Sequence, residues 1–290
     1  MKTFQIITDS SCDLPQELAD KLDLQVLPLH FTIGGQTYAN YLDGREIGFH
    51  DFFERIRQGE EASTSAVNPE SFREAMEKTL QQGLDILFIG FSSGLSTTYQ
   101  SGCIAADDLR ADYPEREIYV VDSLSASLGQ GLLLYLTVQQ KRAGLSAKEL
   151  ADWVVSNRLS VDHWFTVDDL NYLKRGGRVS ATSALLGTML SIKPVMHTSD
   201  EGKLVPVGKV RGRKASLNAL IDKIGELGIA PEKQTMFICQ ADCEDEARWV
   251  ADQIKARYGT PEVHINFIGP VIGSHTGPNT IGIFFVGKER

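Results

Sequence analysis

The segment that decides the fold is DILFIGFSSGLSTTYQSG, residues 85–102. Four apolar residues at 86–89 lead into Gly90, and a cluster of hydroxyl side chains follows. A short apolar run bounded by glycine is typical of a buried strand, so we predict a strand at 85–91 and a helix at about 95–110. The hydroxyls have two explanations: they cap the helix, or they donate hydrogen bonds to an anionic ligand.

Strand and helix signals alternate through the first half of the chain, which is typical of a largely parallel sheet flanked by helices. The extended runs there lie at residues 4–9, 85–91 and 117–123. Beyond about residue 160 the pattern changes to a hairpin signal at 193–211, followed by separate strands and helices. We therefore predict an α/β domain, residues 1–160, and an α+β domain with a mainly antiparallel sheet, residues 161–290.

Composition excludes several classes of protein. The 290 residues are 42% hydrophobic and 23% charged, which is ordinary for a globular protein. The net charge of -9 argues against a nucleic-acid binder, and no apolar run approaches the ~20 residues of a membrane span. The N-terminus turns polar too early for a signal peptide, so we expect a cytoplasmic protein. The four cysteines lack zinc spacing, so we expect reduced thiols and no metal site.

Polar loops follow three strands of the predicted parallel sheet. They are Thr8–Ser11, Ser92–Gly94 and Asp122–Ser123. The carboxyl ends of parallel strands share one edge of a sheet, and ligands bind at that edge. Ser, Thr and Asp are also the usual helix N-caps, so capping and ligand binding both remain open as explanations.

Two further segments carry candidate ligand-binding residues. ASTSAVNP, residues 62–69, places Thr64 and Ser65 just before a helix, where they are either caps or ligand donors. GSHTGPNTIG, residues 273–282, holds His275 in a glycine-rich turn between two expected strands. A lone histidine is usually structural, but one held in such a turn is often positioned to reach a ligand.

In NYLKRGGRVS, residues 171–180, the cations Lys174, Arg175 and Arg178 flank two consecutive glycines. A helix that ends at Gly176 would place Lys174 and Arg175 near its negative pole, which is a sufficient structural explanation. A contact with a partner or a phosphate is the functional alternative. The apolar residues that follow, at 184–192, are expected to be core.

Seven motifs, in this order, resemble the signature of the DegV family. They are ITDSSCDLP, TSAVNP, FSSGLSTTYQS, VVDSLSASLGQG, NYLKRGGRVS, IKPV and IGSHTGPNTIG. The resemblance extends from about residue 6 to residue 286, and the family includes the fatty-acid-binding subunits of bacterial fatty acid kinases. It implies a two-domain protein with a long-chain fatty acid bound at and between the domains.

The resemblance also implies roles for particular residues. Thr64, Ser93 and His275 would hold the carboxylate of the acid. A separate ATP-dependent fatty acid kinase would phosphorylate it to an acyl phosphate, and Arg175 and Arg178 would face that partner. The protein itself would be a carrier without catalytic activity or cofactor. The wider set expected near the ligand is Ser65, Ser92, Gly94, Thr97, Ser274 and Asn279.

Two positions depart from the usual pattern of the family. Thr97 stands where glycine is common, which adds a side chain near the expected carboxylate site. Asn279 also replaces a common glycine, but asparagine tolerates positive φ better than most residues, so we expect the turn to be kept.

Two enzymatic alternatives remain. GFSSG, residues 90–94, matches the G-x-S-x-G nucleophile elbow of serine hydrolases, with Ser92 in the central position. A phosphotransfer enzyme acting on a small polyol or ketone is the second, although the chain has no P-loop motif. A scaffold role explains none of the polar loops.

Overall fold

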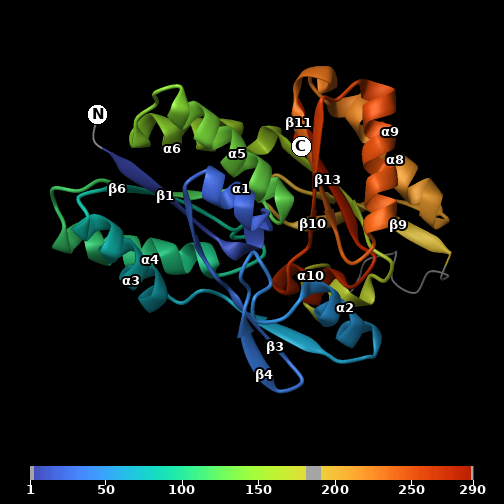
Figure 1. Ribbon diagram of the computed structural model, residues 1–290, viewed down its shortest axis with the longest axis horizontal. Coiled ribbons are helices and arrows are strands. Elements are labelled where there is room, and N and C mark those ends of the chain that lie inside the picture. The colour runs from blue at the N-terminus through green and yellow to red at the C-terminus, as the bar shows by residue number, and fades with distance from the viewer. Residues whose placement is uncertain (1–2, 181–190, 289) are drawn as a thin grey trace.

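The computed structural model describes residues 3–180, 191–288 and 290. The expected apolar core segment at 184–190 lies outside these residues. Three sheets organise the fold, and Figure 1 shows the N-terminal and C-terminal halves side by side with a small antiparallel sheet below them. Among the described residues, no helix is both long and apolar enough to cross a bilayer.

The first sheet is parallel, as predicted, with the order β2-β1-β6-β7. Its strands are β1 (Phe4–Asp9), β2 (Leu24–Leu27), β6 (Asp85–Gly90) and β7 (Ile118–Asp122). The helices of this half are α1 (Gln16–Lys21), α3 (Pro69–Gln81), α4 (Thr98–Asp112), α5 (Leu128–Arg142) and α6 (Ala147–Asn157). In Figure 1, α3 and α4 lie on one side of the sheet, and α5 and α6 lie on the other.

The second sheet is mixed and mainly antiparallel, with the order β10-β9-β8-β13-β11-β12. Its strands are β8 (Val161–Thr166), β9 (Ile192–Thr198), β10 (Leu204–Arg211), β11 (Thr235–Gln240), β12 (Glu262–Phe267) and β13 (Ile281–Val286). The helices α8 (Arg213–Leu227) and α9 (Glu244–Tyr258) pack on it. The hairpin and three of the strands confirm the predicted pattern. β8 is a central strand that the sequence reading missed.

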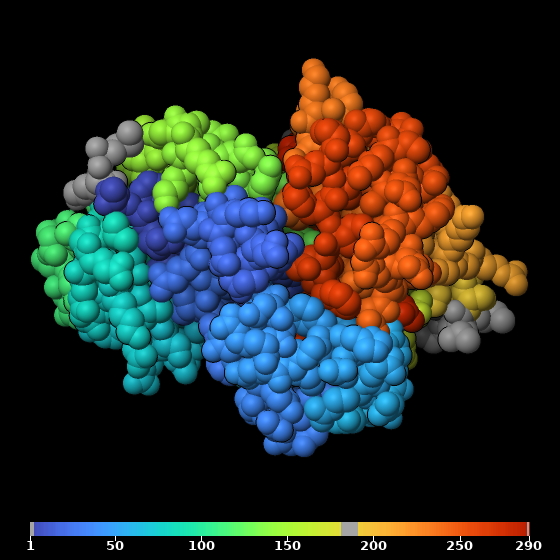
Figure 2. All heavy atoms as spheres, viewed as in Figure 1, coloured from blue at the N-terminus to red at the C-terminus, as the bar shows by residue number. Residues whose placement is uncertain are grey.

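The third sheet, β4-β3-β5, is antiparallel and bridges the two halves. It consists of β3 (His30–Ile33), β4 (Gln36–Ala39) and β5 (Ala62–Ser65), and α2 (Phe49–Arg57) connects β4 to β5. Figure 2 shows this blue to light-blue segment in contact with both the N-terminal and the orange-red C-terminal surface. The division into domains at residue 160 stays a prediction.

Three local expectations are corrected by the structure. Thr64 and Ser65 belong to strand β5, and Asn68 caps α3 by accepting a hydrogen bond from the Ser71 N–H at 2.8 Å. His275 lies in the last turn of a short helix, α10 (Pro270–Thr276), and not in a turn. The helix after β6 begins at Thr98, about three residues later than predicted, and Ser92 does not cap it.

Phe88 at the centre of β6 shows how tightly this half is packed. Its side chain is fully buried and meets Phe72 of α3 edge to face, with ring centroids 4.8 Å apart. Gly102 of α4 lets the helix approach this ring, because a Cβ there would lie 2.3 Å from Phe88 Cε1. Protein interiors tolerate such added volume poorly.

Gly102→Ala should therefore destabilise the protein by roughly 1–3 kcal/mol, although a glycine-to-alanine change inside a helix normally stabilises by about 1 kcal/mol. Urea unfolding of the two proteins measures the difference in free energy. Ile104→Ala in the same helix, at a side chain that is 45% exposed, is the control and should shift stability by only about 0.5 kcal/mol. A more stable Gly102→Ala variant would contradict the close packing of α4 on Phe88.

Candidate ligand-binding site

A cavity of about 430 Å³ lies where the three sheets and α10 meet. This volume is within the range of ~300–1,000 Å³ that is typical of small-molecule sites. Its wall is mainly apolar, formed by Leu29, Ala66, Phe91, Leu95, Ala126, Phe165, Leu173, Leu204, Ile268, Val271, Ile272 and Phe284. The cavity therefore suits a ligand with a long apolar part.

Exposure changes from one part of the cavity to another. Ser93 and Thr97 are exposed, and Thr64, Arg178 and His275 are partly buried, so these residues form the mouth. The side chains of the deep wall are much less accessible: His163 is 1% exposed, Cys239 3%, Phe284 4% and Ser127 5%. The cavity therefore has a polar, more exposed end and a largely apolar, buried end.

Thr64 and His275 face each other at the mouth. Pairing of β5 with β3 fixes Thr64, and α10 presents His275, so that Thr64 Oγ1 lies 2.8 Å from His275 Nε2. Burial and then the nearby Arg178 cation lower the pKa of His275 to about 4, so the imidazole is neutral at physiological pH. Its Nδ1 is buried without a partner in the described chain, beside Gly176, where a Cβ would lie 2.2 Å away.

Arg178 is a cation at the same mouth, and the described part of the chain gives it no counter-ion. Its guanidinium donates to the Leu95 carbonyl, with Nη2 at 3.0 Å, and to the Gly176 carbonyl. Within the described residues it makes no ion pair, and burial lowers its pKa. Arg178 lines the cavity, so its placement favours contact with a ligand over the predicted contact with a partner. An anion at the mouth would complete its interactions.

The loop after β6 brings Ser93 to this cluster. The Ser93 N–H donates to Asp122 Oδ1 at 3.2 Å, and this bond ties the loop to the end of β7. The Ser93 hydroxyl makes no hydrogen bond to the described residues. Ser65 and Thr97 line the cavity as well. The three residues expected to hold a carboxylate, Thr64, Ser93 and His275, thus all line one cavity.

Ser92 and Gly94 support the loop and do not line the cavity. The Ser92 hydroxyl donates to the Gly202 carbonyl at 2.8 Å and is fully buried. A Cβ at Gly94 would lie 2.6 Å from the Glu201 carbonyl oxygen, so only glycine fits there. With its hydroxyl bound to a carbonyl, and with neither a histidine nor a carboxylate bonded to it in the described chain, Ser92 lacks the activation that a nucleophile requires.

The residues that line the cavity do not include Ser274, Asn279 or Arg175. Ser274 donates to the Pro270 carbonyl at 2.7 Å. Asn279 has φ 60, as expected for the turn, and its amide donates to Asp168 Oδ2 at 2.9 Å. Arg175 is exposed and pairs with Glu61 at 3.1 Å. Ser274 and Asn279 thus bond within the fold, and Arg175 lies on the surface.

The sequence reading missed three residues of the deep wall: Ser127, His163 and Cys239. Ser127 could have been predicted as a site residue, because it belongs to the motif VVDSLSASLGQG. His163 and Cys239 are ordinary strand residues in sequence, and only the pairing of β8, β13 and β11 brings them to the cavity. All four cysteines are free thiols.

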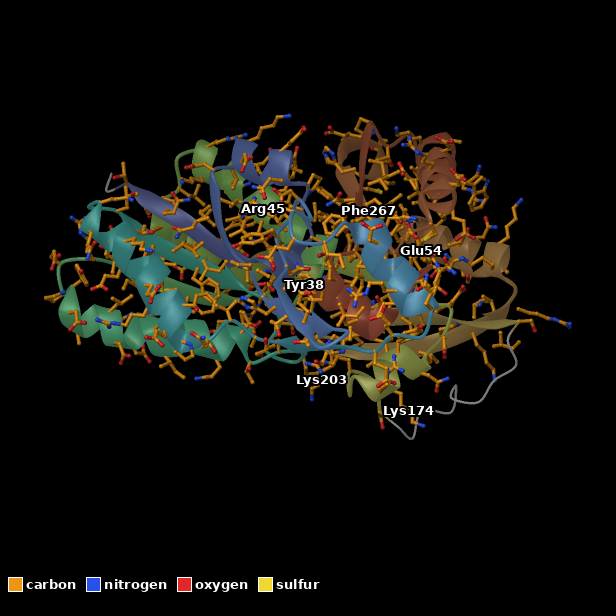
Figure 3. All side chains as sticks on the ribbon, turned by 60° about the horizontal axis from the view of Figure 1, so that its bottom comes forward. Tyr38, Arg45, Glu54, Lys174, Lys203 and Phe267 are labelled. Carbon is orange, nitrogen blue, oxygen red and sulfur yellow. The ribbon has the colours of Figure 1, made fainter. Side chains whose placement is uncertain are left out.

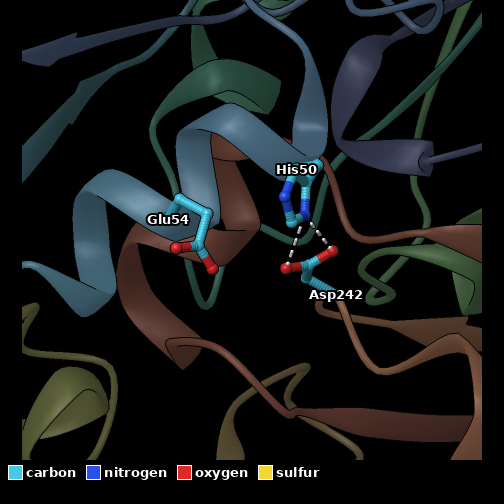
Figure 4. A group of neighbouring side chains, drawn as sticks. All are labelled: His50, Glu54 and Asp242. Carbon is cyan, nitrogen blue, oxygen red and sulfur yellow. Dashed lines mark hydrogen bonds and ion pairs between the residues drawn. The ribbon is translucent and has the colours of Figure 1, made fainter.

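One cluster resembles a metal site. His50, Glu54 and Asp242 place a ligand atom each within 4.8 Å of one another, and Figure 4 shows the contact of His50 with Asp242. The Arg57 guanidinium pairs with both Glu54 and Asp242, so a cation already occupies the group. This cluster joins α2 to the loop after β11.

Fold and cavity together define an α/β protein that encloses a largely apolar cavity with a polar mouth. A family model described as "Uncharacterised protein, DegV family" matches residues 3–288. A DegV domain-containing protein of Clostridium perfringens is 42% identical over 290 residues, which cover 100% of this chain and 99% of the relative. The chain belongs to the DegV family.

Solved structures agree with this assignment. A DegV family protein from Thermus thermophilus, described as binding fatty acid, has 29% sequence identity and a TM-score of 0.86, with 98% of this chain and 99% of that chain covered. DegV of Bacillus subtilis, a fatty acid binding protein, has 26% identity and a TM-score of 0.86, with 99% and 100% covered.

The buried neutral state of His275 predicts a pH dependence of stability. The unfolded chain takes up a proton near the ordinary pKa of 6.5, whereas the folded chain does so only near 4. Stability should therefore fall as the pH drops from about 7, and the contribution of His275 should reach about 3 kcal/mol by pH 4. His275→Gln keeps a polar group but does not titrate.

The free energy of unfolding, measured for both proteins between pH 7 and pH 4, isolates this contribution, because all other groups titrate in both. The wild-type protein should lose more stability than His275→Gln over that range. Parallel curves would mean that His275 is not buried in its neutral form.

Proposed function

We propose that this protein binds a long-chain fatty acid in the cavity and presents its carboxylate at the mouth to a separate ATP-dependent kinase. The observation that carries the proposal is the polar mouth of an otherwise apolar cavity. Hydroxyl groups, an imidazole and a guanidinium that has no ion pair among the described residues converge there. The fatty acid binding described for the T. thermophilus and B. subtilis proteins supports the same class of ligand.

The tail would supply most of the affinity. Burying about fifteen methylenes at ~0.8 kcal/mol each gives on the order of 12 kcal/mol. Ordering of the chain and loss of translational freedom remove a large part of this, which leaves an affinity between about micromolar and nanomolar. Tail burial favours any amphiphile of suitable length, so it does not select an acid.

The mouth would select the acid. A carboxylate only accepts hydrogen bonds, and it matches the donors that Thr64 and Ser93 offer. Because Thr64 Oγ1 and His275 Nε2 are bonded to each other, an Nε2–H that donates to Thr64 leaves the Thr64 hydroxyl free to donate to the acid, and Arg178 adds positive charge. Hydrogen bonds to a charged group contribute about 1.5–3 kcal/mol each, more than bonds between neutral groups.

The proposed kinase contact would form around this mouth. Figure 3 shows Lys174 and Lys203 at one edge of the molecule, with their side chains pointing outward. Both are exposed, as is Arg175. The turn that carries Lys203 is bonded through Gly202 to Ser92, next to Ser93. Positive charge beside the mouth would favour a kinase with an acidic docking surface.

Extraction of the purified, denatured protein with organic solvent, followed by mass spectrometry, tests the ligand class directly. We expect a long-chain fatty acid in near-stoichiometric amount, and its length and unsaturation identify the preferred chain. An empty extract from protein that also fails to take up added fatty acids would remove the proposal. In that case ATP turnover by the isolated chain, on a small polyol or ketone, becomes the function to test.

The carboxylate site is tested by matched variants. Ser93→Ala, His275→Ala and Arg178→Gln should each weaken palmitate binding by about 1–3 kcal/mol, which is roughly 5- to 150-fold in Kd by calorimetry. Arg175→Gln and Ser274→Ala alter neighbouring side chains that do not line the cavity, and should leave Kd unchanged. Equal losses in both groups would indicate general disruption of the mouth and contradict the assigned roles.

The same variants separate binding from presentation. With ATP and a purified bacterial fatty acid kinase, loaded wild-type protein should yield acyl phosphate, and neither protein should do so alone. Arg175→Gln should bind palmitate normally but be phosphorylated more slowly, if Arg175 contacts the kinase. Acyl phosphate formed by this chain and ATP without a kinase would make it an enzyme and overturn the carrier proposal.

A further inference from the structure

Strand β13 divides its side chains between the two faces of the mainly antiparallel sheet. Ile281 and Phe285 belong to the core that this sheet forms with α8 and α9. Thr280, which directly precedes the strand, and Phe284 line the cavity on the other face. Successive residues of a strand alternate between the faces, so Gly282 lies between these two on the cavity side. β13 thus forms part of the cavity wall.

This part of the wall has no side chain at Gly282. Its φ is not positive, so other residues could adopt this backbone conformation, and the glycine matters for the space it leaves. A Cβ there would lie 2.9 Å from Cys239 Sγ, 3.1 Å from Phe284 Cζ and 3.4 Å from Phe165 Cβ. Cys239 and Phe165 are its direct partners in β11 and β8, and both line the cavity. The tip of the Phe284 ring therefore leans over Gly282, into space that a larger residue would fill.

The Phe284 ring lies at the deep end of the cavity. It meets His163 edge to face, with ring centroids 5.4 Å apart. His163 in turn packs against α5, since a Cβ at Gly129 would lie 2.0 Å from His163 Nε2. Phe284 is 4% exposed and His163 1%, and α5 packs on β8, β11 and β13. Phe284 thus stands between the cavity and the solid packing of the sheet against α5.

The opposite end of the same strand lies beside the mouth. The Thr280 hydroxyl donates to the Thr276 carbonyl at 3.1 Å, and Thr276 follows His275 at the end of α10. From Thr280 to Phe284 the strand rises by roughly 13 Å at ~3.3 Å per residue. An acyl chain whose carboxylate is held at His275 and whose tail follows β13 would therefore approach Phe284 with its methyl end.

We propose that Phe284 is the stop for the acyl chain and thereby sets the longest fatty acid that the cavity accepts. The inference rests on the fatty acid binding proposed above and specifies which chain lengths the protein selects. A packed aromatic ring gives a firm limit, because moving it deeper requires displacement of His163 and of α5 behind it. Gly282 lets the ring tip lean over the wall, so two positions of one strand together fix this limit.

The test compares chain lengths in proteins altered at these two positions. Calorimetry of protein freed of bound lipid gives Kd for a series of saturated acids from lauric to arachidic acid. Wild-type protein should bind more tightly up to one length and more weakly beyond it. In Phe284→Ala the optimum should move to a longer acid, and each methylene that enters the new space should tighten binding by about fourfold. Gly282→Ala should move the optimum to a shorter acid, because the added methyl group displaces the ring or the Cys239 thiol into the cavity.

Phe285→Ala is the matched control. Phe285 is fully buried in the core on the other face of β13 and is not among the residues that line the cavity. Its replacement removes the same side chain from the same strand, so it reproduces the loss of packing without enlarging the cavity, and the optimum should stay at the wild-type length. An unchanged optimum in Phe284→Ala, or an equal shift in Phe285→Ala, would show that the Phe284 ring does not set the limit.

A photoreactive acid tests the inference on the wild-type protein, whether or not the variants fold. Palmitic acid with a diazirine at its methyl end should, on irradiation, label the β13 peptide at Phe284 or its neighbours His163 and Cys239, as identified by mass spectrometry. Labelling of the mouth at Ser93, or of the wall formed by the first half of the chain at Leu29, would overturn the inference although fatty acid binding stands. If no acid binds the wild-type protein, the fatty acid proposal fails and this inference fails with it.

Discussion

A buried carboxylate, that of Asp13, joins the parts of the molecule that form the cavity. Its Oδ2 accepts from Ser127 at the start of α5, and its Oδ1 accepts from the Gly269 N–H at 3.0 Å, where α10 begins. The Asp13 carbonyl also accepts from the Asn266 side chain at 2.7 Å. Asp13, which lies in the segment that follows β1, therefore positions two helices. One is α10, which carries His275, and the other is α5, whose first turn faces His163.

Burying the Asp13 carboxylate costs free energy, and the packing of the surrounding core offsets this cost. Burial raises the pKa of Asp13 to about 7, which means that the folded protein holds this carboxylate against an unfavourable environment. The first two turns of α5 are fully buried against the mainly antiparallel sheet, and include Leu128, Leu132 and Leu133. Apolar packing of α5 thus offsets the desolvation of the polar junction at its N-terminus.

Sequence reasoning succeeded where structure is set by neighbours along the chain. The parallel strands and the hairpin of β9 and β10 follow from local spacing, and both are present. It failed where pairing between distant strands decides the structure. Thr64 was expected at the start of a helix but lies in strand β5, because β5 pairs with β3. Strand β8 was missed because both of its faces are buried, so its sequence shows no alternation of polar and apolar residues. The seven-residue α10, with glycines around it, could not be told from a turn.

The same distinction applies to the site. Family motifs pointed to Thr64, Ser93 and His275, and these residues line one cavity, although binding by them is still a proposal. The motif could not reveal that Ser92 turns to the Gly202 carbonyl while its neighbour Ser93 stays at the mouth, nor that Arg178 lies on the cavity wall and Arg175 outside. Side-chain direction depends on contacts made across the fold.

The exposure gradient along the cavity is what would make a binding protein a useful carrier. Each methylene drawn out of an apolar site costs ~0.8 kcal/mol, so a partner that had to extract even half of a fatty acid would work against several kcal/mol. Here the donors lie at the exposed end, with Ser93 and Thr97 open to solvent and His163 1% exposed. A carboxylate held there could react while the tail remains fully bound. In such a carrier, affinity would come from the buried end of the cavity and access to the carboxylate from the exposed end.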